Sequence, residues 1–171
     1  MTMKARWIEM NKESDLRLHR CCFTGHRPEK LCISEPVVIA SLERAIRQAV
    51  SDGFTTFISG MARGVDIWAA EVVLQLRDAG APIHLIAASP YMGFENSWSP
   101  EWRSRFAAAM AGADIVKYVS QGYDRGCFQR RNEWMVDRSA RVIAVFNGEK
   151  GGTKNTIDYA DRQGVPVVFI S

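Results

Sequence analysis

Apolar residues in this chain form short runs that alternate with helical stripes. The runs predict six apolar strands, at 20–24, 54–59, 83–88, 115–119, 142–146 and 165–170. Between 35 and 52, apolar residues recur at three- and four-residue steps: Val38, Leu42, Ala45, Ile46 and Ala49. That segment predicts an amphipathic helix, and the same reasoning predicts helices at 64–79, 101–111, 129–139 and 155–163.

Strands separated by helices favour parallel pairing, because each return to the sheet needs a crossover connection. The pattern therefore predicts a single α/β domain over residues 20–171: a doubly wound, mostly parallel, Rossmann-like sheet of about six strands. A chain of 171 residues is near the usual size of one domain. Residues 1–19 are interpreted as a polar leader that is free to be flexible.

Composition narrows the class of protein. The apolar share of 47% and the charged share of 24% are ordinary globular values, and they exclude a disordered chain or a disulfide mini-protein. The net charge, 22 − 19 = +3, is too small to indicate a nucleic-acid binder unless the positive charges cluster. With no apolar run of membrane-spanning length and no signal-peptide core, we expect a cytoplasmic protein without membrane contact.

The cysteines indicate no metal site. The four of them, at 21, 22, 32 and 127, include no C-x-x-C pair and have no histidine at ligand spacing. Neither a zinc site nor a disulfide framework is predicted. Adjacent Cys21 and Cys22 are expected to pack as small apolar residues of the first strand.

Polar and glycine-rich turns follow three of the strands, where doubly wound sheets bind their ligands. After the first strand, Gly25 allows close backbone approach, and Thr24 and Arg27 suit a phosphate or carboxylate. A turn in which His26 and Arg27 are merely solvated explains the same residues. All three turns are expected at one edge of the sheet, with Gly60 and Gly152 on the same side.

The second turn runs from Ser59 through Gly60, Met61 and Gly64 to Asp66. Its glycines expose backbone N–H groups at the positive end of a helix, which is an anion site. Asp66 either caps those amides or binds a ribose hydroxyl. The sequence matches neither a Walker A loop nor G-x-G-x-x-G.

The third turn, Gly151-Gly152-Thr153, also precedes a predicted helix, and two such loops can face one ligand from both sides. On the helix over 129–139, one side combines Arg130, Glu133, Trp134 and Asp137. That side is either an ordinary salt-bridged surface or a pocket wall.

Aromatic residues concentrate after the third strand: Tyr91, Phe94, Trp98, Trp102 and Phe106. A base could stack on these rings, and packing onto the domain or onto a dimer partner is the favoured alternative. Trp98 and Trp102 would lie one helical turn apart if the helix begins early.

Four motifs in order resemble the YpsA-type family of the SLOG superfamily, which also includes DprA and the LOG-type phosphoribohydrolases. They are residues 22–31, the turn 59–66 with the following 67–71, residues 131–137, and Gly151-Gly152-Thr153. The Ser59 turn and the Arg131-Asn132 pair also resemble segments of DprA. The resemblance runs from about Arg20 to the C-terminus.

The resemblance implies a Rossmann-like domain that binds a nucleotide or a nucleotide-derived molecule, and it makes self-association plausible. The expected ligand-binding residues are Thr24, Gly25, Arg27, Ser59, Gly60, Met61, Gly64, Asp66, Arg131, Asn132, Glu133, Gly151, Gly152 and Thr153. No cofactor is assigned beyond that ligand.

Catalysis is not implied to the same degree. When Gly152-Thr153 is placed on the G-T of the hydrolase motif P-G-G-x-G-T-x-x-E, Thr156 occupies the glutamate position. The remaining candidates for catalysis are Glu133, Arg131 and Asp66.

Three functions stay open: a nucleotide-binding or sensing protein, which we favour, a phosphoribohydrolase or N-glycosidase, and a DprA-like single-stranded DNA binder. Acidic residues interleave with the arginines between 124 and 141, which favours a small ligand over DNA.

Overall fold

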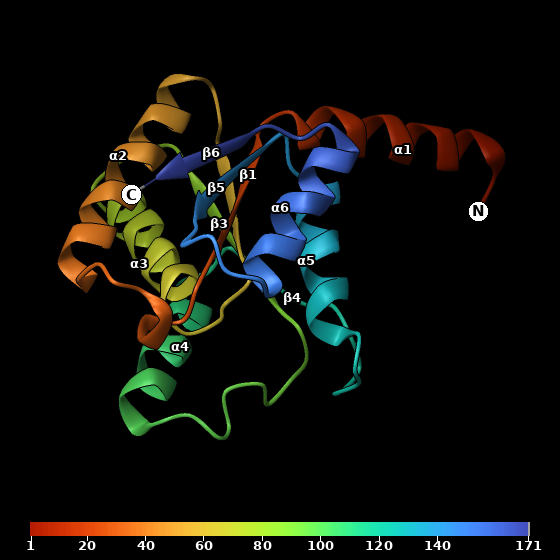
Figure 1. Ribbon diagram of the computed structural model, residues 1–171. Coiled ribbons are helices and arrows are strands. Elements are labelled where there is room, and N and C mark those ends of the chain that lie inside the picture. Colours follow the sequence, from red (N-terminus) through yellow and green to blue (C-terminus); the bar gives the residue numbers. More distant parts are fainter. Residues whose placement is uncertain (171) are drawn as a thin grey trace.

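Six strands form one parallel sheet in the order β4-β3-β2-β1-β5-β6 in the computed structural model (Figure 1). Their bounds are β1 Arg20–Gly25, β2 Thr56–Ser59, β3 His84–Ser89, β4 Ile115–Tyr118, β5 Arg141–Val145 and β6 Val167–Ile170. All neighbouring strands pair in parallel, so the predicted doubly wound α/β fold is confirmed. The structure describes residues 1–170, apart from the Asn11 side chain, and Ser171 of the expected domain lies outside the described residues.

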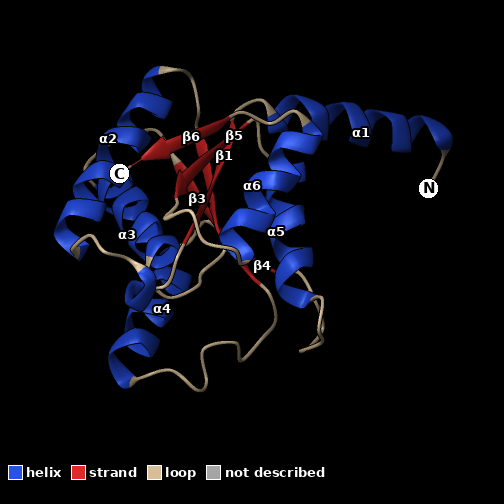
Figure 2. Cartoon of the chain, viewed as in Figure 1, coloured by secondary structure: helices blue, strands red, loops and turns tan. Residues whose placement is uncertain are grey.

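Helices cover both faces of the sheet (Figure 2). One face carries α2 Glu35–Ser51, α3 Val65–Asp78 and α4 Pro100–Gly112, and the other carries α5 Cys127–Asp137 and α6 Gly152–Gln163. A short 3-10 turn, η1, spans Pro28–Lys30. This layering is the reason that the apolar stripe of α2 faces inward, with Val38, Leu42 and Ile46 fully buried.

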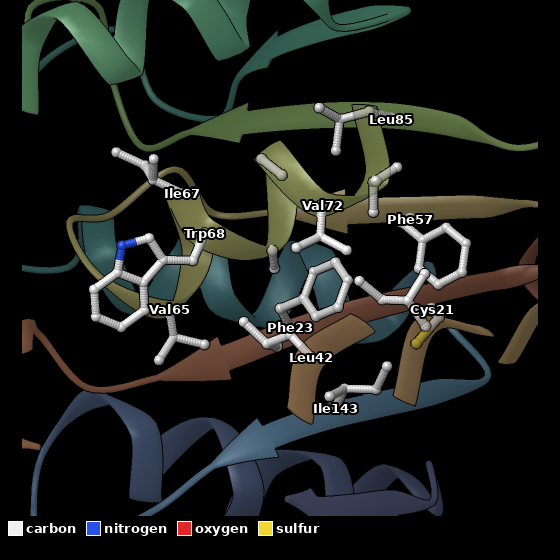
Figure 3. Close-up of a cluster of buried hydrophobic side chains, with 14 of the residues drawn as sticks. Cys21, Phe23, Leu42, Phe57, Val65, Ile67, Trp68, Val72, Leu85 and Ile143 are labelled. Atoms are coloured by element: carbon white, nitrogen blue, oxygen red, sulfur yellow. The ribbon is translucent and has the colours of Figure 1, made fainter. Parts of the chain in front are cut away.

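The larger core lies between the sheet and the α2–α4 layer (Figure 3). The Phe23 ring of β1 stacks on Phe57 of β2, with 5.9 Å between ring centroids and 16° between planes. Cys21 belongs to this core, whereas Cys22, which points to the opposite face, packs against the α5–α6 layer. Burial raises the pKa of both thiols, so they are inert apolar packing groups, as the sequence predicts.

Helix α1, Met3–Arg17, extends away from the rest of the molecule (Figure 1). This is the segment interpreted above as a leader. The Thr2 hydroxyl caps it by accepting from the Ala5 N–H at 3.3 Å, and Arg17 donates to the Ser139 carbonyl at 3.0 Å. Apolar patterning could not predict this helix because its large apolar residues, such as Met3 and Trp7, are exposed rather than aligned on the core. Among residues 1–170, no helix has both the length and the apolar character that a bilayer crossing requires.

Four of the five predicted helices start at a residue other than the expected one, and the differences at α6 and α4 affect the site. Helix α6 begins at Gly152, three residues before the expected start, so Gly151–Thr153 form the helix N-terminus itself. Helix α4 begins at Pro100 after the Ser99 cap, so Trp98 precedes the helix and is not one helical turn from Trp102.

The strand order reverses between β1 and β5: β2, β3 and β4 follow β1 on one side, and β5 and β6 lie on the other. Helix α2 leaves β1 toward one side, and α6 leaves β5 toward the other, which opens a crevice at the carboxyl ends of these strands. Because β2 and β5 both run parallel to β1, Gly60 and Gly152 lie at the same edge of the sheet, as predicted.

Gly25 brings β1 close to α3, and we expect Gly25→Ala to destabilise the protein. A Cβ at residue 25 would lie 2.5 Å from the Val65 Cβ, so strand and helix would have to separate. Overpacking of this kind costs about 1–3 kcal/mol, measurable by urea unfolding. The control is Gly122→Ala, where a Cβ meets no heavy atom within 4 Å. Equal stability of the two variants would contradict the close approach.

Candidate functional site

A cleft of about 750 Å³ lies at the carboxyl edge of the sheet. Five segments line it: residues 23–30, the β2–α3 turn at 62–66, the aromatic loop at 91–99, helix α5 at 128–135, and the α6 N-terminus at 151–153. Its volume falls in the range of small-molecule sites. The glycine-rich turns that the sequence places at one sheet edge therefore do open onto one cavity.

The N-terminus of α6 suits an anion. Gly151 precedes the helix with φ +146°, and the first turn has neither a side-chain cap nor an acidic residue. A Cβ at Gly152 would have only the Asn132 Nδ2 within 4 Å, at 4.0 Å, so this end of the helix is open to the cleft. Uncapped N–H groups together with the helix dipole attract a phosphate or carboxylate.

The turn between β2 and α3 is fixed by its own polar groups. The Ser59 hydroxyl accepts from the Met61 N–H at 3.2 Å and donates to the Asp66 carbonyl at 2.7 Å. Met61 adopts φ +61°, a left-handed conformation that is uncommon outside glycine. Gly64 is required as well, because a Cβ there would lie 2.8 Å from the His26 carbonyl oxygen. Ser59, Met61 and Gly64 shape the turn and are not part of the cleft lining.

Asp66 and Arg131 form a charged centre at the base of the cleft. Their exposed fractions are 6% and 5%. A Cβ at Gly60 would lie 2.8 Å from the Asp66 Oδ2 and 2.9 Å from the Arg131 Nη1, so a larger residue there would displace the carboxylate or the guanidinium. Arg131 also donates to the Gly60 carbonyl, and its Nε donates to the Asn132 Oδ1 at 2.8 Å.

Burial controls the ionisation of this centre. It raises the pKa of the Asp66 carboxyl to about 6, against the opposing effect of the Arg131 charge and of the Ala62 N–H, which donates to Oδ2 at 3.3 Å. Burial also lowers the pKa of Arg131, and the Asp66 charge opposes that change. Each charge therefore offsets part of the effect of burial on the other group.

The cleft as a whole is cationic. Arg27, Lys30, Arg63 and Arg131 line it, and Asp66 is the only carboxylate among the described lining residues. Arg63 is paired with Glu29 at 3.1 Å, whereas Arg27 and Lys30 are exposed. His26 is buried rather than solvated, and its ring stacks on Phe146 with 5.7 Å between centroids. Burial and the nearby Lys30 lower the pKa of His26, so the ring is neutral at pH 7.

The aromatic residues after β3 divide into two groups. Tyr91, Phe94 and Trp98 line the cleft, together with Phe128 of α5. Trp102 instead packs on Trp68 of α3 with 6.1 Å between centroids, and Phe106 is buried in the core. The sequence leaves open whether these rings stack on a base or pack onto the domain or a dimer partner. In the structure, Tyr91, Phe94 and Trp98 line the cleft, whereas Phe106 is buried in the core.

Most of the predicted ligand-binding residues line the cleft: Thr24, Gly25, Arg27, Asp66, Arg131, Asn132, Gly151, Gly152 and Thr153. Ser59, Gly60, Met61 and Gly64 belong to the turn beneath it. Glu133 is not among the lining residues, and its carboxylate accepts from the Gln129 side chain at 3.3 Å. Sequence reasoning did not assign Lys30, Arg63 and Phe128 to the site. Only their positions in the folded structure show that they line the cleft.

Thr156, at the position of the hydrolase glutamate, is fully buried. Its hydroxyl donates to the Gly152 carbonyl at 2.8 Å and so stabilises the first turn of α6. Over residues 1–170, no group of His, Cys, Asp and Glu side chains is arranged to hold a metal ion.

Comparisons with known proteins agree on one family. The family described as the YspA SLOG family (YpsA) matches residues 21–166. A UPF0398 protein of Shouchella clausii is 30% identical over 153 residues, which cover 84% of this chain and 81% of that protein. The SPbeta prophage-derived protein YoqJ of Bacillus subtilis is 32% identical over 118 residues, which cover 62% of this chain and 69% of that protein.

Solved structures of DprA share the fold. DprA from Streptococcus pneumoniae matches with a TM-score of 0.64 and 21% identity over 90% of this chain, which spans 50% of that chain. DprA from Helicobacter pylori, a structure described for its single-stranded DNA binding mode, matches with a TM-score of 0.62 and 19% identity over 92% of this chain and 67% of that one.

The charge state of Asp66 makes stability depend on pH. Because its pKa is raised from 3.8 to about 6, the folded state binds more protons than the unfolded state between these values, and stability falls as pH rises through that range. This change in pKa corresponds to a loss of about 3 kcal/mol. We expect urea unfolding between pH 4 and 7 to show that the unfolding free energy of the parent falls by this amount relative to that of Asp66→Asn. Parallel pH profiles of the two proteins would contradict it.

Proposed function

The chain belongs to the YpsA family of SLOG proteins, and on that premise we propose that its cleft binds a nucleotide or a nucleotide-derived small molecule. The observation that carries this proposal is the meeting of the uncapped α6 N-terminus and four cationic side chains in one cleft of about 750 Å³. Doubly wound sheets bind phosphorylated ligands at this place, where the strand order reverses.

Electrostatics favour a phosphate group over other anchors. Arg27 and Lys30 are exposed and lie on the loop that follows β1, across the switch point from α6. A phosphate can accept from the backbone N–H groups of α6 and from these side chains together, which gives charge-assisted hydrogen bonds. The Asp66 carboxylate is offset by Arg131, so the net charge of the cleft stays positive.

Binding, rather than hydrolysis, is the activity that we propose. Cleavage of a ribosyl bond needs an anion beside an oxocarbenium-like centre. Thr156 has no carboxylate and uses its hydroxyl on Gly152, and Glu133 lies outside the lining. Asp66 does line the cleft, but it is almost fully buried beside Arg131.

Single-stranded DNA is the second candidate ligand. It is favoured by the structural likeness to DprA of Helicobacter pylori and by the combination of cations and aromatic rings in the cleft. A DNA-binding protein would show affinity that rises with oligonucleotide length and falls steeply with salt. Weak dependence on salt, with tight binding of a mononucleotide, would favour the small ligand.

Gly152→Val tests the anion end of the cleft. A ligand at 100 times its dissociation constant adds about 2.7 kcal/mol of stability, which raises the melting temperature of the parent. Nucleoside monophosphates, nucleoside diphosphates and ADP-ribose are the probes. A Cβ at residue 152 would lie 4.0 Å from the Asn132 Nδ2, and the valine methyl groups would take up space at the α6 N-terminus, so we expect a folded protein without ligand-induced stabilisation.

Gly122→Val is the matched control, because it adds the same side chain to an open loop outside the cleft. It should retain the stabilisation of the parent. If Gly152→Val retains it too, the phosphate does not bind at α6. If no probe stabilises the parent protein, the proposed function is wrong.

Incubation with nucleoside monophosphates should release no substantial amount of free base. Without an available carboxylate, the rate should be lower by about 100- to 1000-fold, the usual cost of losing one preorganised stabilising group. Chromatography of overnight reactions measures the released base. Rapid release by the parent that disappears in Glu133→Gln or Asp66→Asn would establish a hydrolase that uses a carboxylate at another position.

A further inference from the structure

Four aromatic rings form a wall of the cleft that phosphate binding does not explain. This aromatic wall consists of Tyr91, Phe94, Trp98 and Phe128. The first three lie on the long loop between β3 and α4, the green segment at the bottom of Figure 1, and the fourth lies in the first turn of α5. No acidic side chain lines the cleft within this loop.

The four rings contact one another edge-on or at a tilt. Phe94 meets Trp98 at 75° and Tyr91 at 73°, and Phe128 meets Phe94 at 54° and Tyr91 at 50°. No pair within the wall is a parallel stack. The rings are only partly buried, with 37% of Phe128 exposed, so a planar group can still stack on the wall.

The wall is held in place by the rest of the fold. Trp98 packs edge-on against the buried Phe106 of α4, with 5.5 Å between centroids. At the other end, the Ser89 hydroxyl donates to the Tyr91 carbonyl at 3.1 Å. Turn hydrogen bonds within the loop include Trp98 N–H to the Glu95 carbonyl at 3.0 Å. A surface held in this way costs little ordering entropy when a ligand binds.

Helix α5 links the wall to the anion end of the cleft. Phe128 belongs to the wall, and Asn132, four residues later, lies beside Gly152 at the start of α6. Four residues of helix span about 6 Å along the axis. The ribose of a nucleotide separates its 5′ phosphate from its base by a similar distance.

We propose that the aromatic wall stacks on the base of a nucleotide whose phosphate binds at the α6 N-terminus. This inference rests on the proposed function and adds the substrate class: the cleft selects base-bearing nucleotides over phosphorylated sugars. Stacking on aromatic side chains is worth about 5- to 140-fold in affinity per base, which corresponds to about 1–3 kcal/mol.

Calorimetry with adenosine monophosphate and ribose 5-phosphate tests the proposal. The two probes share the phosphate and the ribose and differ in the base. The parent should bind adenosine monophosphate more tightly by about 5- to 140-fold. Phe128→Ala should weaken binding of adenosine monophosphate by a similar factor and leave binding of ribose 5-phosphate unchanged.

Three further variants separate stacking from packing. Tyr123→Ala is the matched control, because Tyr123 contacts Tyr91 and Phe128, is 68% exposed, and does not line the cleft. It should leave both affinities unchanged. Phe128→Tyr keeps an aromatic face and should bind adenosine monophosphate as the parent does, whereas Phe128→Leu fills similar space without that face and should not.

The outcomes distinguish failure of this inference from failure of the proposed function. Equal affinity for the two probes, or full affinity in Phe128→Leu, overturns base stacking and leaves the phosphate site in place. Binding of neither probe overturns both. Binding of oligodeoxythymidylate alone, lost in Phe128→Ala, would instead assign the wall to single-stranded DNA.

Discussion

The buried charges of Asp66 and Arg131 determine how the two helical layers meet at the cleft. Asp66 belongs to α3 on one face of the sheet, Arg131 belongs to α5 on the other, and the guanidinium also binds the carbonyl of Gly60 after β2. Burial disfavours the charged form of each group, and the charge of each group opposes that effect on the other. The floor of the cleft, and the approach of α5 to the β2–α3 turn, therefore depend on these two side chains together.

This centre also explains why residues of one sequence motif have different roles. In the turn from Ser59 to Asp66, the serine, the glycines and Met61 position the backbone around the charges, and Ala62, Arg63 and Asp66 reach the cleft. The α6 turn is built differently, since the first turn of α6 has no acidic residue, whereas the first turn of α3 contains Asp66. The two glycine-rich turns resemble each other in sequence, but one supports the fold of the site and the other is available to a ligand.

The fold could be predicted from sequence because burial imposes periodicity, as in the Val38, Leu42 and Ile46 stripe of α2. Other features depend on contacts that no local pattern records. A glycine indicates close approach but not its partner, and at Gly60 the partners are Asp66 and Arg131. Glu133 is expected beside Arg131, but two residues along a helix turn a side chain by about 200°, and Arg131 lines the cleft whereas Glu133 does not. The sequence around Phe128 does not predict that this residue lines the cleft, because its ring contacts Tyr91 and Phe94, which lie on a loop distant in sequence.

The loop between β3 and α4 contributes three of the four wall residues, yet it contains no strand and no residue of the Asp66–Arg131 centre. Surface loops of this kind tolerate substitution and changes of length far better than strands do. Descendants of one ancestral protein could therefore exchange this loop and acquire a preference for a different ligand without rebuilding the phosphate-binding end. The architecture separates the part of the site that is free to diverge from the part on which folding depends, so proteins that share this fold need not share a ligand.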